Sequence, residues 1–329
     1  MKPLSLLILI VLASVGVFAG DAESNGTDAQ IVPRVLRQVS VQASSFLPKA
    51  DIRADTNVVL VPVTVTDTLN RFVMGLDRDA FQVYEDKIQQ KIVSFGCDDA
   101  PLSMGIVFDA SGSMGPKLER SRAAVAAFLK AANPEDEAFL VEFSDRPRLA
   151  VPLTHDFEQI QNQLINIRPK GRTALFDSVY LALNTLKKAH NPRKVLLLIT
   201  DGGDNRSRYT QTEVKHLLEE ADVQLYGIGI YESGKTRRRS PEELAGPRVL
   251  QELSEPTGGR HFVVESVSEL PDIASKIGVE LHNQYVVGYS PSNPDRDGKY
   301  RRIAVRLVQP PGFPSLFAYW RTGYVAPTQ

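Results

Sequence analysis

The middle of the chain alternates between continuous apolar runs and stretches in which apolar residues recur every three or four positions. Continuous apolar runs occur at residues 104–108, 138–143, 149–153, 195–199, 223–230 and 262–264. Helical spacing occurs between most of them, in residues 118–132, 157–167, 175–189, 212–221 and 270–281. A fully apolar run such as 195–199 is typical of a strand covered on both faces. The alternation predicts an α/β domain with a doubly wound, mostly parallel sheet.

Both flanks of this region carry shorter β-type patterns, rich in β-branched and aromatic residues. They occur at residues 58–66, 72–73, 81–84 and 91–95 before the middle region, and at 284–289, 300–308 and 317–320 after it. Neither flank alone has enough strands to bury a core. We therefore expect the N- and C-terminal segments to pair into one flanking β-sandwich, with the α/β domain inserted between them.

The first residues of the chain differ from all the others. Lys2 precedes an apolar run over residues 4–17, which ends in Phe18 and Ala19. A positive start, a short apolar run and a small residue at the cleavage point describe a secretory signal peptide. The run is short for a membrane span. We expect an exported protein, periplasmic or secreted, with no membrane segment after cleavage, and an uncleaved anchor is the alternative.

These patterns give a plan for the whole chain, which at 329 residues is long enough for about two domains. Residues 20–54 are polar and rich in Ser, Ala and Asp, which is typical of a flexible segment. The plan comprises a signal peptide (1–19), a flexible lead-in (20–54), an N-terminal β segment (55–98), the α/β domain (99–282) and a C-terminal β segment (283–325).

Composition excludes some functions. The formal net charge of −1 provides no field that would attract nucleic acid, so we expect no nucleic-acid partner. Cys97 is the only cysteine, and an intramolecular disulfide is therefore impossible. Because Cys97 follows a β-type run, we expect it to be a small buried hydrophobic residue rather than a reactive thiol.

A polar loop follows the first apolar run of the α/β region directly. Asp109, Ser111 and Ser113 stand at alternate positions there. In a doubly wound sheet, the carboxyl ends of the strands form the edge where ligands bind. An extended loop can aim alternate side chains at one point, and one carboxylate with two hydroxyls makes a set of hard oxygen ligands. The competing interpretation is that these residues only cap the helix that follows.

Two further loops weaken the capping interpretation. Thr173 lies in a glycine-led loop just before a helix, and Asp201 follows the apolar run 195–199. Asp109 and Asp201 therefore both emerge from the carboxyl ends of strands in one predicted sheet. The sequence thus predicts a divalent metal site, with Mg²⁺ as the foremost candidate and Mn²⁺ or Ca²⁺ as alternatives.

Charge counting predicts what such a site would bind. At most two carboxylates neutralise the dication, and a helix starting near Pro116 would point its positive end toward the loop. An open metal position should then attract an Asp or Glu side chain of a partner protein. Asp177 and Asp204 are candidates for supporting roles around the ligands, with helix capping as the alternative for Asp177. For Asp204 and its neighbour Asn205, a solvated turn is the favoured interpretation.

The three loops together resemble the metal-ion-dependent adhesion site of von Willebrand factor A domains. The resemblance covers residues 99–282, and it rests on strand-DASGS at 109–113, GRTAL at 171–175 and ITDG at 199–202. The flanking VPVTVTD at 61–67 and RTGY at 321–324 are similar to bacterial exported proteins called von Willebrand factor A-related. The resemblance implies the sheet order 3-2-1-4-5-6. It also implies a set of metal ligands, with the last in direct contact or acting through water: Asp109, Ser111, Ser113, Thr173 and Asp201.

These features favour an exported, metal-dependent protein-binding module for adhesion or assembly, without enzymatic activity. One alternative is a cell-envelope scaffold in which the metal only stabilises the loop. Another is a metal-dependent phosphatase-like hydrolase, because Asp109 follows a buried strand as an aspartyl nucleophile does. That class needs a second acid where this chain has Ser111. The five histidines show no spacing typical of metal ligands, and we expect them to be surface or satisfied core residues: His155, His190, His216, His261 and His282.

Overall fold

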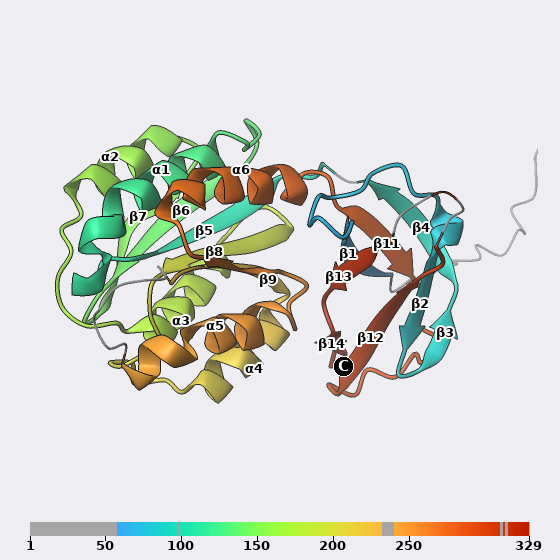
Figure 1. Ribbon diagram of the computed structural model, residues 1–329. Coiled ribbons are helices and arrows are strands. Elements are labelled where there is room, and N and C mark those ends of the chain that lie inside the picture. Colours follow the sequence, from blue (N-terminus) through green and yellow to red (C-terminus); the bar gives the residue numbers. More distant parts are fainter. Residues whose placement is uncertain (1–57, 98, 232–239, 310–311, 313–314, 329) are drawn as a thin grey trace, which may run out of the picture. The chain divides into compact units, whose positions relative to one another are not determined.

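The computed structural model describes residues 58–97, 99–231, 240–309, 312 and 315–328 (Figure 1). The expected signal peptide and flexible lead-in, at residues 1–19 and 20–54, lie outside the described residues. Within the described part of the chain, no helix is long and apolar enough to cross a membrane.

A six-stranded sheet forms the centre of the α/β domain. Its strands are β5 (Leu102–Asp109), β6 (Glu137–Phe143), β7 (Pro147–Thr154), β8 (Arg193–Thr200), β9 (Val223–Ile230) and β10 (His261–Val264). Their spatial order is β10-β9-β8-β5-β6-β7, and only β7 runs antiparallel to its neighbour. This is the 3-2-1-4-5-6 order that the resemblance implied. The predicted doubly wound α/β fold is confirmed.

Six α-helices cover the two faces of this sheet (Figure 1). They are α1 (Leu118–Leu129), α2 (Phe157–Asn166), α3 (Leu175–Leu186), α4 (Gln211–Ala221), α5 (Pro241–Ser254) and α6 (Leu270–Leu281). Helices α1, α2 and α6 pack on one face, and α3, α4 and α5 on the other. Three short 3₁₀ helices complete the description: η1 (Arg78–Ala80), η2 (Gly112–Lys117) and η3 (Val267–Glu269).

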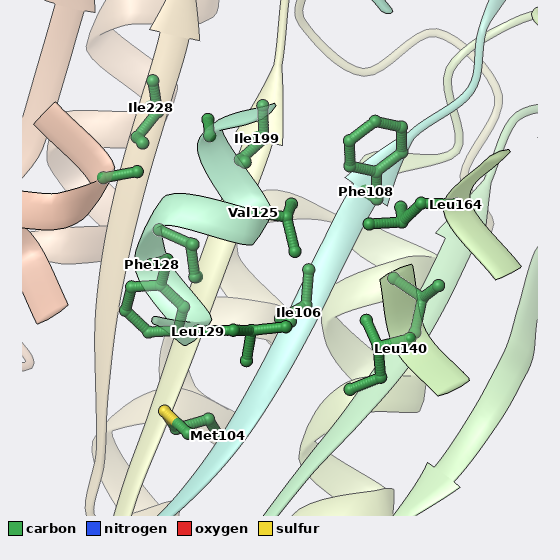
Figure 2. Close-up of a cluster of buried hydrophobic side chains, with 14 of the residues drawn as sticks. Met104, Ile106, Phe108, Val125, Phe128, Leu129, Leu140, Leu164, Ile199 and Ile228 are labelled. Carbon is green, nitrogen blue, oxygen red and sulfur yellow. The ribbon is translucent and has the colours of Figure 1, made fainter. Parts of the chain in front are cut away.

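Strand β5 is buried along its whole length, which makes it a rigid support for the loop that follows. Alternate side chains of β5 point to opposite faces, as the two-residue period of a strand requires. Met104, Ile106 and Phe108 belong to one buried cluster with Val125 and Phe128 of α1 and Leu164 of α2, and Phe108 lies beside Leu164 (Figure 2). Val107, which points the other way, contributes to the core on the opposite face. Asp109 is the last residue of β5, and it is therefore held between the two helical layers that cover the sheet.

The N- and C-terminal segments form a shared β-sandwich, as predicted. One sheet has the order β13-β1-β11-β4 and the other β14-β12-β2-β3. The strands are β1 (Val59–Thr66), β2 (Phe81–Glu85), β3 (Ile88–Gln90), β4 (Ile92–Cys97), β11 (Tyr285–Tyr289), β12 (Tyr300–Leu307), β13 (Phe317–Trp320) and β14 (Gly323–Val325). Val61 and Val63 of β1 share one core with Val83 of β2 and Val305 of β12, so the two sheets pack face to face.

Several local predictions were wrong. Cys97 is exposed, because β4 is an edge strand that is mostly solvent-facing and Cys97 is its last residue. Phe72 forms only an isolated bridge with Thr66 rather than a strand. The helix expected to start near Pro116 begins at Leu118, after the 3₁₀ helix η2.

A buried ion pair joins the end of α6 to the turn before β6. His282 Nε2 lies 3.1 Å from Asp136 Oδ2, and its Nδ1 lies 2.9 Å from Asp99 Oδ1. Asp136 also accepts a hydrogen bond from the Leu102 backbone at 2.7 Å. Burial lowers the pKa of His282, but the two carboxylates outweigh it, and the net effect raises the pKa above 6.5. Burial likewise opposes the bonds that lower the pKa of Asp136, and the bonds prevail.

The His282 pair should make stability depend on pH. Because the folded pKa lies above the unfolded value, the contribution is complete below about pH 6.5 and is lost as pH rises through the folded pKa. We expect wild type to be more stable than His282→Gln at pH 5.5, with the difference shrinking toward pH 8.5. The change should be about 1 kcal/mol or less, because the Asp99 side is open to solvent. Urea unfolding of both proteins across this range tests it, and parallel curves would contradict it.

Candidate metal centre

The first loop of the predicted site begins at a fully buried carboxylate. Asp109 ends β5 and has no solvent exposure. Its Oδ1 accepts the Ser111 backbone N–H at 2.8 Å, and its Oδ2 accepts the hydroxyl of Thr200 at 2.6 Å. Thr200 comes from the end of the adjacent strand β8. These two bonds fix both oxygens of Asp109 without consuming all their lone pairs.

A chain of hydroxyl contacts links the first loop to the third. Ser111 Oγ lies 3.1 Å from Ser113 Oγ, and Ser113 Oγ donates to Asp201 Oδ1 at 2.8 Å. Asp201 follows β8 directly, and its side chain is 1% exposed. Four of the five predicted ligands, Asp109 included, therefore lie within one hydrogen-bonded group at the carboxyl edge of the sheet.

Thr173 belongs to the second loop, which the backbone holds against the first. The Gly112 N–H donates to the Gly171 carbonyl at 3.1 Å, and the Lys170 N–H donates to the Ala110 carbonyl at 2.9 Å. Gly171 has a φ of +76°, and a Cβ there would lie 2.3 Å from Asp145 Oδ2. The positive φ and the close approach of Asp145, from the turn between β6 and β7, therefore favour glycine at this position.

Asn205 was predicted to lie in a solvated turn, but it holds Thr173 from two sides. Its Oδ1 accepts the Thr173 N–H at 2.9 Å, and its own N–H donates to the Thr173 carbonyl at 3.0 Å. These bonds fix the backbone from which the Thr173 hydroxyl projects. Asn205 could have been recognised only from its place after Asp201, because an Asn in a Gly- and Ser-rich stretch is also typical of turns.

Asp177 and Asp204 accept hydrogen bonds from backbone N–H groups next to the second and third loops. Asp204 Oδ1 accepts the Leu175 N–H at 2.8 Å, so it caps the first turn of α3. Asp204 is half-buried, so the favoured prediction of a solvated turn was wrong for Asp204, whereas Asn205 is exposed, as that prediction has it. Asp177 Oδ1 accepts the N–H groups of Arg208 and Tyr209 at 2.8 and 3.1 Å. Asp177 therefore holds the loop after β8 to α3 and does not cap its own helix through these bonds.

The electrostatics of the site are dominated by burial. Desolvation raises the pKa of Asp109 to about 7, and the neighbouring charge of Asp201 adds to the rise. The bonds from Thr200 and Ser111 oppose this shift but do not reverse it. A buried carboxylate of this kind is costly to ionise alone, and a bound cation would offset that cost.

One charged residue at the site was not predicted from the sequence. Lys117, the last residue of η2, forms a close ion pair through Nζ with Asp201 Oδ2. Its side chain is 13% exposed. The available signal was its position four residues after Ser113 on the turn that starts α1, but a lysine near a helix start is commonly a solvated residue.

The loops surround a cavity of about 200 Å³. Hydroxyls of Ser111, Ser113 and Thr173 lie among its lining residues, with Asn205 beside them. Glu242 and Glu243, from the first turn of α5, line the opposite rim. The cavity is large enough for a hydrated cation and part of one ligand side chain.

The donor set fits a small hard cation. Mg²⁺ binds oxygen at about 2.0–2.1 Å, so neighbouring ligand oxygens of an octahedron lie roughly 2.9 Å apart. The 3.1 Å between the two serine hydroxyls and the 2.8 Å from Ser113 to Asp201 match that spacing. No cluster of three or more His, Cys, Asp or Glu side chains that could hold a metal occurs among the residues described above. Two carboxylates and three hydroxyls are therefore the donors to consider.

The fold and the loops define a class, a doubly wound α/β domain with polar loops gathered at the carboxyl edge of its sheet. Residues 104–203 match the family model of the von Willebrand factor type A domain. This range includes all five predicted ligands. The chain therefore contains a von Willebrand factor type A domain, as the resemblance of its loops implied.

Curated relatives share this region at low identity. A protein of Borreliella burgdorferi described as uncharacterized is 28% identical over 210 residues, which are 54% of this chain and 61% of that protein. Inter-alpha-trypsin inhibitor heavy chain 4 of Mus musculus is 30% identical over 135 residues, which are 36% of this chain and 14% of that protein. The chain thus spans less than two thirds of the length of either relative.

Two solved structures that align with the chain are the following. The von Willebrand factor type A protein from Catenulispora acidiphila aligns with a TM-score of 0.48 and 11% identity, over 82% of this chain and 74% of that chain. BatB from Bacteroides thetaiotaomicron, described as a conserved hypothetical protein, aligns with a TM-score of 0.44 and 20% identity, over 55% of this chain and 98% of that chain.

Proposed function

We propose that the protein is a metal-dependent binding module that presents a divalent cation, Mg²⁺ foremost, to an acidic side chain of a partner protein. Asp109, Ser111, Ser113 and Thr173 would hold the metal, and Asp201 would contact it directly or act through a water. The observation that carries this proposal is the hydrogen-bonded group of carboxylates and hydroxyls beside a cavity at the edge of the sheet.

The charges around the site support an acidic partner. Asp109 and Asp201 provide two negative charges, and the ammonium of Lys117 offsets one of them. A dication added to this set leaves one net positive charge, while the remaining ligands are neutral hydroxyls. A carboxylate from a partner would neutralise that charge beside the buried Asp109 and Asp201, where electrostatic attraction is stronger than in water.

The rim of the cavity supports dependence on the metal. Glu243 forms a capping box with Ser240, with hydrogen bonds of 3.1 and 3.2 Å, which holds the first turn of α5 at this place. Glu242 and Glu243 both lie among the residues that line the cavity. An acidic ligand would be repelled by them when the cation is absent. The cation would offset this repulsion at the point where the ligand binds.

A peptide titration tests this function. We expect Mg²⁺-loaded protein to bind a short peptide with one central Glu, and to bind the same peptide with Gln at least about tenfold more weakly, because only Glu supplies a charge. EDTA should abolish the difference. Isothermal titration calorimetry measures both steps. The variant Asp109→Ala should bind neither Mg²⁺ nor the Glu peptide, and retention of peptide binding by this variant would reject the proposal.

Two other functions are separated by the same experiments. Mg²⁺ binding without preference for the Glu peptide would indicate a scaffold in which the metal only stabilises the loops. Turnover of an aryl phosphate with Mg²⁺ would indicate a hydrolase. We propose a non-enzymatic role because Ser111 stands where phosphatases with an aspartyl nucleophile need a second acid.

We also propose that the protein works outside the cytoplasm, periplasmic or secreted, after cleavage near residue 19. The sequence pattern of residues 1–19 supports this, with its positive start and short apolar run. N-terminal sequencing of the protein recovered from its own cells tests it. A mature protein that begins at Met1 would contradict cleavage.

A further inference from the structure

The charge beside Asp201 is buried and anchored. Lys117 ends η2 directly after Pro116, whose ring restricts the backbone there. Ser121 of α1 donates its hydroxyl to the Lys117 carbonyl at 3.1 Å, which adds a second restraint. The ammonium therefore reaches Asp201 from a fixed point, with the two side chains 13% and 1% exposed. Such a pair differs from flexible surface pairs, which contribute little.

Asp201 stands between this ammonium and the proposed metal ligands. Its Oδ2 pairs with Lys117, and its Oδ1 accepts the hydroxyl of Ser113 at 2.8 Å. A cation held by Ser113 and the ammonium of Lys117 would therefore share one carboxylate from opposite sides. No other lysine or arginine forms an ion pair with Asp201 in the part of the chain that the structure describes.

We propose that Lys117 is a specificity-determining residue of the metal centre, which weakens metal binding and strengthens the binding of an acidic ligand to the metal. This inference rests on the proposed function, because it requires that Asp109 and its partner residues hold a cation. The role of Lys117 is to place a positive charge beside Asp201. It contacts neither the metal nor the ligand, and it acts through Asp201.

The physical reason is that the ammonium of Lys117 repels a cation at the site but attracts a carboxylate of a ligand. A positive ammonium a few ångströms from the site repels a dication, and little water screens them at this burial. It also withdraws the charge of Asp201 from the metal, which leaves the metal more electrophilic. The same ammonium attracts an incoming carboxylate. Removal of the charge should therefore change metal affinity and ligand affinity in opposite directions, whereas loss of a merely structural residue should weaken both.

Lys117→Gln provides the test, because glutamine removes the charge and keeps a hydrogen-bond donor for Asp201. We expect the variant to bind Mg²⁺ about tenfold tighter than wild type by calorimetry. At saturating Mg²⁺, we expect it to bind the Glu peptide at least about threefold more weakly. Lys117→Arg should stay near wild type in both measurements. Lys130→Gln is the matched control, because Lys130 is an exposed lysine at the other end of α1 and should change neither affinity.

The failures of the two proposals are distinguishable. Wild-type protein that binds no Mg²⁺ would overturn the proposed function and this inference with it. Wild type that binds Mg²⁺ and the Glu peptide, together with a Lys117→Gln variant of equal or weaker Mg²⁺ affinity, would overturn the role of Lys117 alone. Thermal unfolding in EDTA checks that the variants are folded. If Lys117→Gln is not folded, Lys117→Met serves as the second neutral variant.

Discussion

Asp109→Asn should be more heat-stable than wild type in EDTA at pH 8, and Mg²⁺ should no longer raise its melting temperature. The carboxylate is fully buried, and its pKa is raised to about 7 by burial and by the charge of Asp201. Above that pH, ionisation costs the folded state on the order of 4 kcal/mol, because one pKa unit is worth about 1.4 kcal/mol. Asparagine keeps the shape, accepts the Ser111 N–H and can donate to Thr200.

The gain in EDTA should be several degrees, and wild type should overtake the variant when Mg²⁺ is added. Differential scanning calorimetry with and without Mg²⁺ measures both effects. Asp79→Asn is the control, because Asp79 is an exposed residue of the β-sandwich and its replacement changes the net charge equally. A lower melting temperature for Asp109→Asn in EDTA would show that the carboxylate stabilises the fold rather than serving the site.

Arg260→Met should destabilise the α/β domain by about 3–5 kcal/mol, as expected when one partner of a buried ion pair is removed. Arg260 Nη1 lies 2.7 Å from Glu280 Oε2, and the two side chains are 7% and 5% exposed. The other oxygen of Glu280 accepts the Tyr226 hydroxyl at 2.9 Å. The guanidinium also lies over the ring of Phe262, 4.9 Å from its centroid. Methionine fills part of the space but leaves the carboxylate without its cation.

The double variant Arg260→Met with Glu280→Gln should recover much of that loss, because it removes the unpaired charge. Urea unfolding of wild type, the single variant and the double variant gives the comparison. Arg248→Met is the matched control, since Arg248 pairs with Glu252 on the exposed face of α5 and should matter little. Equal loss in the single and double variants would assign the effect to packing of the arginine stem instead.

The fold was predictable because its strands are either fully apolar or clearly alternating. Residues 195–199 have no polar position at all, and β8 is buried there on both faces. The three-residue strands β3 and β14 escaped prediction, since three residues cannot display a period. Cys97 was misjudged for another reason. Its neighbours are apolar, but an edge strand exposes apolar residues too, and edges follow from strand order rather than local sequence.

The site residues that lie at the ends of strands could be predicted from the sequence, because the order of the strands brings those ends together. Asp109 and Asp201 each end an apolar strand, and the structure brings them together through Ser113 and Thr200. The sequence could not reveal the bonds that Asn205 makes to Thr173, because they depend on how two separate loops meet. The pairing of Lys117 with Asp201 was hidden for the same reason. Side chains that pair between separate loops show no regular spacing along the sequence.

The β-sandwich also determines how the chain would carry tension. The α/β domain leaves the sandwich after β4 and returns to it at β11, and these two strands pair with each other, Cys97 opposite Tyr285. Its two ends are therefore held about 5 Å apart, the spacing of adjacent strands. A pull applied between residues 58 and 328 would act first on the strands of the sandwich, and on the bonds that join Arg321 and Thr322 to the α/β domain. The metal-site loops would keep their geometry under force until the sandwich itself opens.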